Sequence, residues 1–375
     1  MADIAPQRAA PGMRVGVLGA GQLGRMMALA GIPLGMRFTF LSDVASPGAA
    51  QVGEVIVGDY HDRATLERFA ADVDVVTYEF ENVPAETAEI LAAKRPLWPP
   101  PIALATAQDR ANEKSACTKL GIPVAPYMLV DSREALDEAV RTVGAPGVLK
   151  TRRMGYDGKG QARIDTPADA DAAWRALGGV PLIYEGLVRF ERELSVIAVR
   201  NERGECRVYP VTENHHRDGI LRRSIAPAFA LSEERRETAA KYAEHLMESL
   251  GYVGTFAVEM FDTADELIVN EMAPRVHNSG HWTIEGAETS QFENHVRAIC
   301  GLPLGDCAPR GYSAMLNIIG THPNVDRVLS VPDTHLHLYA KSERPGRKLG
   351  HITVRSRTPE LLAARLETLA GALAE

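Results

Sequence analysis

Short apolar runs alternate with glycine turns and helical segments over the first hundred residues. The runs at 14–18, 36–41, 54–57 and 73–78 each have the length and composition of a buried strand. Strands that alternate with helical segments predict a parallel sheet with helices on its faces, that is, an α/β unit. The proline cluster at 99–101 ends this pattern and indicates a domain boundary.

The pattern changes after residue 120. We expect a small α/β unit over 127–190, with a helix at 132–143 and strands at 147–150 and 182–185. A glycine-rich loop follows the first of these two strands.

From residue 191 onward the expected strands are mostly of the kind that pair antiparallel. The runs 194–200 and 205–210 flank a turn of hairpin composition. A long helix at 233–250 and two further strands follow, and the segment after 311 ends in an Ala/Leu-rich helix. This half of the chain therefore predicts an α+β arrangement.

Composition and charge limit the function classes. The 375 residues are 45% hydrophobic and 24% charged, with a formal net charge of −8. The chain has no basic block for a nucleic acid and no apolar run of membrane-spanning length. The four cysteines have neither metal nor redox spacing, and the N-terminus lacks a signal-peptide core. We expect a cytoplasmic protein of two or three domains, with no nucleic-acid or membrane partner.

The first glycine motif resembles a dinucleotide fingerprint. Gly19, Gly21 and Gly24 lie between an expected strand and an expected helix, and Asp43 follows the next strand. Such a turn presents backbone N–H groups to a phosphate, and the acid reaches a ribose. Alone, the motif favours a dehydrogenase, but any tight strand-to-helix turn selects glycine.

The second glycine motif follows a lysine at the end of a strand. Lys150 should extend from the sheet edge into a cleft, and the loop 155–160 lies just beyond it. Glycines let backbone N–H groups approach phosphate oxygens, and Lys159 adds a positive charge. A plain hairpin at Asp157-Gly158 explains the glycines but not the lysine, so a phosphate-covering loop is favoured.

Two acidic residues occupy neighbouring expected strands. Glu259 and Glu271 are separated by a span that suits a hairpin, which would place both carboxylates on one face. Carboxylates so close repel one another unless a cation lies between them, and oxygen ligands beside phosphates indicate Mg²⁺. Two exposed strand acids are an equally good interpretation of the spacing.

The segment directly after Glu271 is rich in polar donors. Arg275, His277, Asn278 and Ser279 lie within five residues of one another and suggest an anion and substrate pocket. A zinc site using His277 and His281 is the alternative, although a proline and an Asn-Ser-Gly turn argue against the helix such sites use.

Basic residues gather again near the C-terminus. Lys341, Arg347 and Lys348 lie on an expected strand and the turn that follows it. They form either a solvated turn or a clamp for a substrate phosphate.

Several strings in one order resemble the ATP-grasp superfamily and, within it, the N5-carboxyaminoimidazole ribonucleotide synthase family of purine biosynthesis. The resemblance runs from about Met13 beyond Leu349. The strings are VLGAGQLGRM at 17–26, YEFEN at 78–82, GYDGKGQ at 155–161, DGILR at 218–222, NEMAPRVHNSGHW at 270–282 and PGRKLGH at 345–351.

The resemblance implies an ATP-grasp fold, α/β and α+β in class, with an N-terminal Rossmann-like (pre-ATP-grasp) domain and a small C-terminal domain. We place these at 1–112, 113–310 and 311–375, with a lid at about 120–185. It also implies ATP with Mg²⁺ or Mn²⁺ as cofactors, and a homodimer. The implied reaction is the ATP-dependent carboxylation of 5-aminoimidazole ribonucleotide by bicarbonate through carboxyphosphate.

The resemblance assigns roles to individual residues. It implies that Lys150, Arg275, His277 and Asn278 are catalytic, and that Glu259 and Glu271 hold the metal. The implied ATP-binding residues are Arg110, Lys150, Gly155, Tyr156, Asp157, Gly158, Lys159, Gly160, Gln161, Glu185, Gly186, Leu187, Val188, Glu193, His216, Asn270 and Glu271. The implied substrate-binding residues are Gln22, Leu23, Glu79, Tyr156, Asp157, Lys159, Ser279, Lys341, Arg347 and Lys348.

Other functions remain open on the sequence. At Lys159 the family often has arginine, and a lysine offers a single charge where arginine offers a two-point contact. A different ATP-grasp ligase would keep the ATP and metal residues but fits the 270–282 and 345–351 strings less well. An NAD-dependent oxidoreductase and a non-catalytic nucleotide-binding module are the remaining alternatives.

Overall fold

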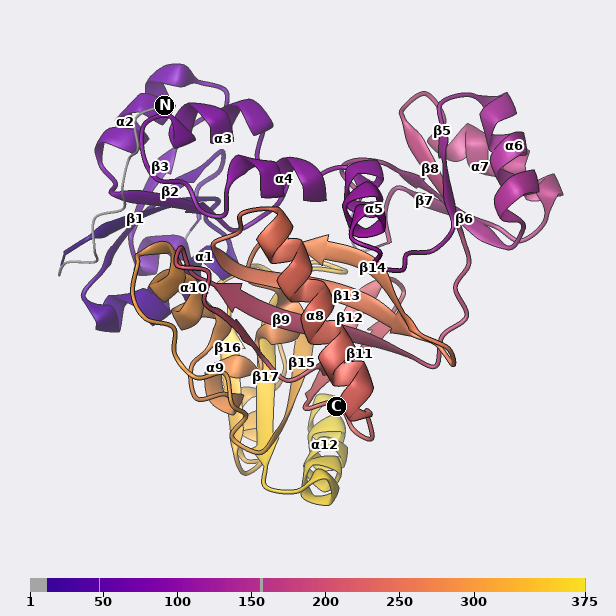
Figure 1. Cartoon of the computed structure of the whole chain (residues 1–375). Helices are drawn as coiled ribbons and strands as arrows, with labels where there is room; N and C mark the ends of the chain where they lie inside the picture. Colours follow the sequence, from indigo (N-terminus) through magenta and orange to yellow (C-terminus); the bar gives the residue numbers. More distant parts are fainter. Residues whose placement is uncertain (1–11, 47, 156–157, 375) are drawn as a thin grey trace.

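The computed structural model describes residues 12–46, 48–155 and 158–374. Tyr156 and Asp157, two of the predicted loop residues, lie outside this range. The chain forms three sheets, and the small unit built from β5 to β8 stands apart from the other two in Figure 1. Among the described helices none is both long enough and apolar enough to cross a membrane.

The N-terminal sheet confirms the predicted parallel arrangement. Its strand order is β3-β2-β1-β4, and every neighbouring pair is parallel. Buried strand residues such as Val15, Val17 and Phe40 form its core with helix α1. The elements are β1 Arg14–Leu18, α1 Gln22–Gly31, η1 Ile32–Leu34, β2 Arg37–Ser42, η2 Ala49–Gln51, β3 Glu54–Val57, α2 Arg63–Ala71, β4 Val75–Tyr78, α3 Ala85–Ala92 and α4 Pro101–Ala107.

The lid unit is a small sheet of order β5-β8-β6-β7 with two helices on one face. The apolar faces of α6 and α7 pack on it through Leu136, Leu149 and Ala173. Its neighbouring strands pair antiparallel. Helix α5 Arg110–Lys119 precedes this unit, whose elements are β5 Tyr127–Val130, α6 Arg133–Val143, β6 Gly147–Thr151, β7 Gln161–Ile164, η3 Pro167–Asp169, α7 Ala170–Leu177 and β8 Leu182–Gly186.

The largest sheet carries the predicted hairpins. Strand β10 returns against β9, and Glu259 on β13 lies directly opposite Glu271 on β14. Helix α8 covers one face with Ala243, Leu246 and Met247. The elements are β9 Arg192–Arg200, β10 Cys206–Val208, β11 Thr212–Arg217, β12 Ile220–Ala226, α8 Glu233–Ser249, β13 Gly254–Asp262 and β14 Leu267–Ala273.

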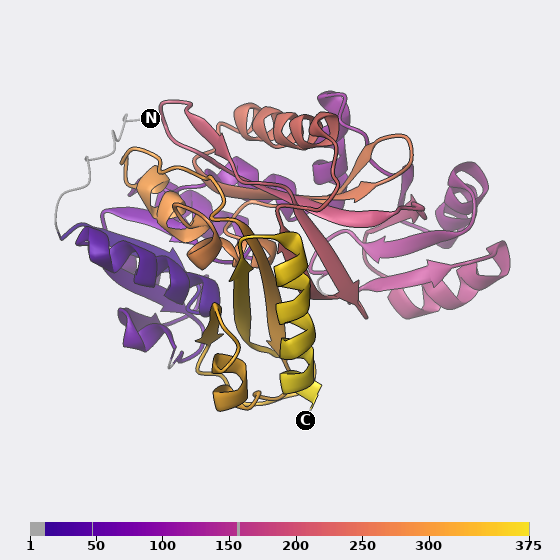
Figure 2. The ribbon, with the colours of Figure 1, turned by 90° about the horizontal axis from the view of Figure 1, so that it is seen from below.

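The C-terminal strands extend this same sheet. The strand order is β14-β13-β9-β11-β12-β15-β17-β16. The C-terminal strands β15, β17 and β16 therefore extend the sheet beyond β12. Figure 2 shows α12 lying along these strands. Helix α10 joins the N-terminal unit to this sheet, because Phe292 and Val296 pack in one cluster with Met27 and Phe38. The elements are η4 Asn278–Gly280, α9 Thr283–Gly286, α10 Gln291–Ile299, β15 Tyr312–Ile319, α11 Val325–Leu329, β16 Thr334–Leu338, β17 Lys348–Ser356 and α12 Pro359–Ala374.

Candidate active site

A cavity of about 700 Å³ is lined by residues of the N-terminal unit, of the small sheet β5 to β8 and of the largest sheet. A larger hollow of about 1060 Å³ around Phe229 and Tyr312 is lined by none of the predicted site residues. The smaller cavity is therefore the candidate active site. The predicted residues that line it are Gln22, Leu23, Glu79, Arg110, Lys150, Gly155, Gly158, Lys159, Gln161, Glu193, His216, Glu259, Asn270, Glu271, Arg275, His277, Asn278 and Lys348.

Some of the predicted site residues do not line the cavity. Glu185 is buried and contacts Lys150, and Arg347 donates to the backbone oxygen and hydroxyl of Ser342. Gly186 ends β8 and lies next to the Leu187 and Val188 pair, which follows that strand. The predicted residues that are not part of the cavity lining are Gly160, Glu185, Gly186, Leu187, Val188, Ser279, Lys341 and Arg347.

The lysine predicted to meet the phosphates is held by a buried carboxylate. Lys150 Nζ lies 3.0 Å from Glu185 Oε2, and Lys114 Nζ lies 3.4 Å from the same oxygen. Lys114 Nζ also donates to the backbone oxygen of Asn270 over 2.8 Å. Burial alone would raise the pKa of Glu185, but the two ammonium groups lower it. The lysines share a single negative charge, so the group leaves positive potential for an anionic ligand.

Lys114 is a residue that the sequence did not assign. It is 1% exposed and lies on helix α5. A buried lysine is rare unless paired, but burial at this position depends on β14 packing against α5. Nothing in the residues around Lys114 predicts that contact.

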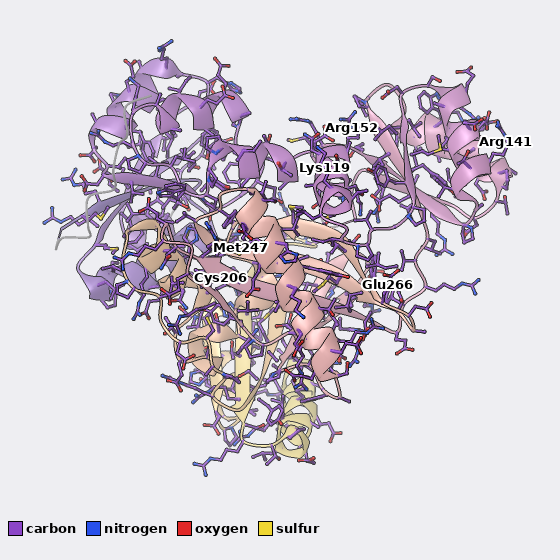
Figure 3. The ribbon with its side chains drawn as sticks, in the orientation of Figure 1. Lys119, Arg141, Arg152, Cys206, Met247 and Glu266 are labelled. Atoms are coloured by element: carbon purple, nitrogen blue, oxygen red, sulfur yellow. The ribbon has the colours of Figure 1, made fainter. Side chains whose placement is uncertain are left out.

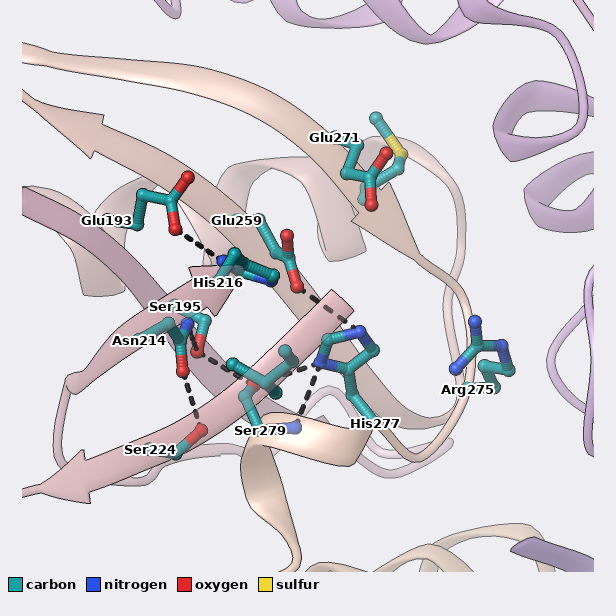
Figure 4. Close-up of polar contacts among 12 residues, drawn as sticks. Glu193, Ser195, Asn214, His216, Ser224, Glu259, Glu271, Arg275, His277 and Ser279 are labelled. Carbon is teal, nitrogen blue, oxygen red and sulfur yellow. Dashed lines mark hydrogen bonds and ion pairs between the residues drawn. The ribbon is translucent and has the colours of Figure 1, made fainter. Parts of the chain in front are cut away.

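Glu259 and Glu271 form the predicted pair of carboxylates. They are directly opposed across β13 and β14, and both face the cavity (Figure 4). Arg110 Nη1 lies 3.5 Å from Glu271 Oε2, and His277 Nε2 lies 3.3 Å from Glu259 Oε1. Burial, followed by repulsion from Glu271, raises the pKa of Glu259 from 4.5 to about 8. Two oxygen donors that repel one another fit a hard divalent cation such as Mg²⁺.

The positions of His277 and His281 do not support the alternative of a zinc site. His277 faces Glu259, whereas the His281 ring lies 4.8 Å from the ring of His351. In residues 12–46, 48–155 and 158–374, no group of three His, Cys, Asp or Glu side chains is arranged to hold a metal.

Mg²⁺ should stabilise the protein more at higher pH. Above its ordinary value of 4.5 Glu259 loses its proton in the unfolded chain, whereas the folded chain keeps it up to about pH 8. The unfolded state then binds fewer protons, so stability falls as pH rises through this window. A cation between the carboxylates removes this cost. We expect the Mg²⁺-induced rise in Tm to be larger near pH 8 than near pH 6, by about 2 °C or more.

Thermal melts with Mg²⁺ and with EDTA at the two pH values measure this difference. The Glu259→Gln variant is the control, because it removes the titrating group and should abolish the pH dependence of the Mg²⁺ effect. An equal Mg²⁺ effect at both pH values in the unmodified protein would contradict the expectation.

The segment after β14 brings its polar groups to the cavity. Arg275 Nε lies 2.5 Å from Glu81 Oε2, and its Nη1 donates to the backbone oxygen of Val276 over 3.1 Å. Both polar atoms of the Asn278 amide are buried and have no hydrogen-bond partner within the described part of the chain. An unpaired buried amide is costly, so this group is suited to a ligand that can both donate and accept.

A glutamine missed by the sequence analysis fixes the backbone of this segment. Gln291 is fully buried, accepts from the His277 backbone N–H over 2.9 Å and donates to its carbonyl over 2.7 Å. These two bonds, one to the backbone N–H and one to the carbonyl, together fix the backbone of His277. Gln291 lies on α10, fourteen residues further along, where no local pattern marked it.

The first glycine turn is occupied by a side chain of the protein itself. The Gly21 N–H donates to the Glu79 carboxylate, and the Gly24 N–H donates to Glu79 Oε2 over 2.8 Å. Glu79 is 8% exposed, and burial raises its pKa. The carboxylate thus takes the place that a dinucleotide phosphate takes in the fingerprint. Lys341 donates to the Gln22 side chain beside it, which keeps a basic group at this end of the cavity.

We expect NADH not to bind measurably, with a Kd above about 1 mM. Its pyrophosphate would have to displace the Glu79 carboxylate from the Gly21 and Gly24 N–H groups and would meet its negative charge. Fluorescence titration with NADH measures this, and a parallel MgATP titration is the positive control. Saturable NADH binding at micromolar concentration would contradict the expectation.

The two arginines left unassigned by the sequence contact the start of α5. Arg152, labelled in Figure 3, forms two bonds with the Asp109 carboxylate, of 3.0 and 2.8 Å. Arg153 Nε lies 3.4 Å from Asp109 Oδ2. Asp109 also caps α5 by accepting from the Ala111 N–H. These bonds tie the end of β6 in the lid to α5.

The far side of the cavity carries a paired acid and imidazole. His216 Nδ1 and Glu193 Oε2 are hydrogen-bonded, and the two residues lie on β11 and β9 (Figure 4). Burial would lower the pKa of His216, but the bond to Glu193 raises it. A carboxylate and an imidazole together suit the hydroxyl groups of a ribose.

A large sheet with paired carboxylates, facing a small lid with a buried lysine and a glycine loop, defines an ATP-grasp enzyme. Three family profiles match in chain order: the ribonucleotide synthetase preATP-grasp domain at 12–108, the ATP-grasp domain at 115–292 and the phosphoribosylaminoimidazole carboxylase C-terminal domain at 313–365. The chain belongs to the N5-carboxyaminoimidazole ribonucleotide synthase family.

Known relatives agree over nearly the whole chain. The N5-carboxyaminoimidazole ribonucleotide synthase of Pseudomonas aeruginosa is 50% identical over 358 residues, 94% of this chain and 98% of that protein. That of Brucella melitensis is 46% identical, covering 92% and 96%. The synthetase structure from Thermus thermophilus matches with a TM-score of 0.93 at 53% identity, covering 96% and 99%.

A solved relative from Aspergillus clavatus contains ADP and 5-aminoimidazole ribonucleotide, with a TM-score of 0.90, 33% identity and coverage of 97% and 99%. The protein is accordingly an ATP-dependent ligase of purine biosynthesis that carboxylates 5-aminoimidazole ribonucleotide. The three profile ranges fall inside the predicted domains, whose boundaries stay a prediction.

Proposed function

We propose that this chain forms N5-carboxyaminoimidazole ribonucleotide from ATP, bicarbonate and aminoimidazole ribonucleotide, in the cavity between the lid and the large sheet. One observation carries the proposal. The directly opposed Glu259 and Glu271 lie in one cavity with Lys150 of the lid and with the Arg275–Asn278 segment. Groups suited to a metal, a phosphate chain and a small oxyanion therefore surround one space.

Glu259 and Glu271 would hold Mg²⁺ or Mn²⁺, which supplies charge neutralisation for the phosphate oxygens when bound. Lys150, kept in place by Glu185, would bind the phosphate chain. His216 and Glu193 would contact the ribose of ATP. Arg110, which pairs with Glu271, would lie beside the phosphates.

In the first step a bicarbonate oxygen attacks the γ-phosphorus of ATP, so that ADP leaves and carboxyphosphate forms. Lys150 and Arg275 neutralise the charge that spreads over the transferring phosphoryl group. The His277 imidazole and the unpaired Asn278 amide orient the bicarbonate.

In the second step carboxyphosphate releases CO₂ and phosphate, and the exocyclic amine of the ribonucleotide attacks the CO₂. The amine then loses a proton. A closed lid keeps water from carboxyphosphate. Glu79, Gln22, Lys341 and Lys348 would bind the ribonucleotide, whose phosphate suits the two lysines.

Substrate dependence tests the proposal. ADP release should reach its full rate only when bicarbonate and aminoimidazole ribonucleotide are both present, because the intermediate is used within the closed site. A coupled ADP assay with each substrate omitted in turn measures this. Turnover with formate or an amino acid in place of bicarbonate would instead support another ATP-grasp ligase.

The oligomeric state and the cellular location are further parts of the proposal. We propose a homodimer in the cytoplasm, with ATP, bicarbonate and the ribonucleotide as its partners. Light scattering of the purified protein measures the oligomeric state directly.

A further inference from the structure

A line of buried polar side chains runs across three strands to His277 (Figure 4). Ser224 on β12, Asn214 on β11 and Ser195 on β9 lie side by side on one face of the large sheet. Ser224 Oγ bonds to Asn214 Oδ1 over 2.7 Å, and Asn214 Nδ2 bonds to Ser195 Oγ over 2.9 Å. Ser195 Oγ lies 2.7 Å from Ser279 Oγ, which lies 2.9 Å from His277 Nδ1.

The line is almost completely buried, and of its serine and asparagine members only Asn214 lines the cavity. Ser195, Ser224 and Ser279 are fully buried, and Asn214 is 6% exposed. Apolar residues would fill these positions at lower cost unless the polar groups had a task. The Ser279 hydroxyl was expected to meet the substrate, but it is engaged by Ser195 and His277, so its route to the cavity passes through His277.

One fixed donor sets the direction of every bond. The Ser279 backbone N–H donates to His277 Nδ1 over 3.3 Å, and a backbone N–H can only donate. Nδ1 therefore carries no proton, and the proton of the neutral ring is on Nε2. That atom lies 3.3 Å from Glu259 Oε1 and faces the cavity.

The other bonds agree with this direction. The Ser279 hydroxyl donates to Nδ1, so its oxygen accepts from Ser195. The Ser195 oxygen in turn accepts from the Asn214 amide, whose own oxygen accepts from Ser224. Asn214, Ser195 and Ser279 each have both a donor and an acceptor partner, and no bond has to be reversed.

We propose that Asn214 and Ser195 are positioning residues, which act through Ser279 to hold His277 as the Nε2–H tautomer with its donor directed into the cavity. This inference rests on the role proposed above for His277 toward bicarbonate. It adds that the imidazole serves that oxyanion as a hydrogen-bond donor, not as a base.

The tautomer is measured by long-range ¹H–¹⁵N correlation spectra of the full chain labelled at histidine, with His277 identified from a His277→Asn sample. The unmodified protein should show Nε2–H only. In Asn214→Asp the carboxylate can only accept, so Ser195 must donate to it and the line reverses. The reversed Ser279 hydroxyl then competes with the Ser279 N–H at Nδ1, so the Nδ1–H form should appear beside the Nε2–H form. Ser195→Ala removes the donor to Ser279 and leaves its oxygen able to accept from Nδ1, so it should shift part of His277 the same way. Ser195→Thr, which keeps the hydroxyl, should restore the original spectrum.

Kinetics separate this inference from the proposed function. For Ser195→Ala we expect kcat/KM for bicarbonate to fall about 10-fold to 100-fold, with KM for ATP within about 2-fold. A shifted tautomer with unchanged kinetics would support the hydrogen-bond line and overturn the role of His277 toward bicarbonate. An Nδ1–H or doubly protonated His277 in the unmodified protein would overturn the inference, as would spectra unmoved by both Asn214→Asp and Ser195→Ala.

Discussion

Replacing Glu271 with glutamine should lower kcat/KM for ATP by roughly 10³-fold or more, because the amide keeps the shape of the side chain and loses its charge. Glu271 is directly opposite Glu259, and the pair supplies the two carboxylates proposed to hold the metal. An amide oxygen binds Mg²⁺ much more weakly than a carboxylate. The fold should persist, since the glutamine still lies within reach of Arg110. Steady-state ADP release at varied MgATP measures the loss.

The same hairpin offers a matched control. Glu266 is exposed in the turn between β13 and β14, and Glu266→Gln removes an equal charge a few residues away. This variant should retain activity within about 2-fold, as surface substitutions do. If Glu271→Gln also stayed within that range, the pair would not be a metal site, and a non-catalytic nucleotide-binding module would become the better interpretation.

Local patterns predicted the opposed carboxylates of Glu259 and Glu271 because both residues belong to one hairpin. The alternation of apolar residues around Glu259 and the short span to Glu271 fix the face and the register together. Lys150 was predicted for a similar reason, since a strand end followed by glycines is visible within a dozen residues.

Contacts between distant segments escaped prediction for a physical reason. Glu79 enters the glycine turn at Gly21 from 58 residues away, and Asn214 meets Ser195 only through the register of β11 on β9. Nothing in the composition near these residues encodes such a pairing. The glycine turn therefore fitted a dinucleotide site as well as it fits its actual occupant.

The neighbours of the C-terminal strands also escaped prediction. The small C-terminal domain was expected, but not that β15 pairs with β12, so that its strands continue the large sheet. Strand patterns give the existence of strands but not their neighbours. The consequence for the site is direct, since Lys348 on β17 reaches the cavity from this extension.

Replacing Arg275 with lysine should reduce kcat by roughly 10³-fold while the protein stays folded. The Arg275 guanidinium lines the cavity with Nε on Glu81 and Nη1 on the Val276 carbonyl. A lysine has one nitrogen, so it can pair with Glu81 or reach the phosphoryl group but not both. Because the half-buried Glu81 keeps a cationic partner, Tm should change little. Rapid-quench measurement of ADP formation tests the chemical step directly.

Two further variants separate catalysis from charge pairing. Arg192 has the same local pattern, with Nε 2.9 Å from Asp262 Oδ2 and Nη1 on the Phe229 carbonyl, but it does not line the cavity. Arg192→Lys should therefore leave kcat within about 2-fold. Arg275→Met leaves the half-buried Glu81 charge unpaired and should cost about 1–3 kcal/mol of stability, which a further Glu81→Gln change should largely restore without restoring activity. Recovery of kcat in that double variant would show that Arg275 serves only to neutralise Glu81, and its role at the transferring phosphoryl group would be lost.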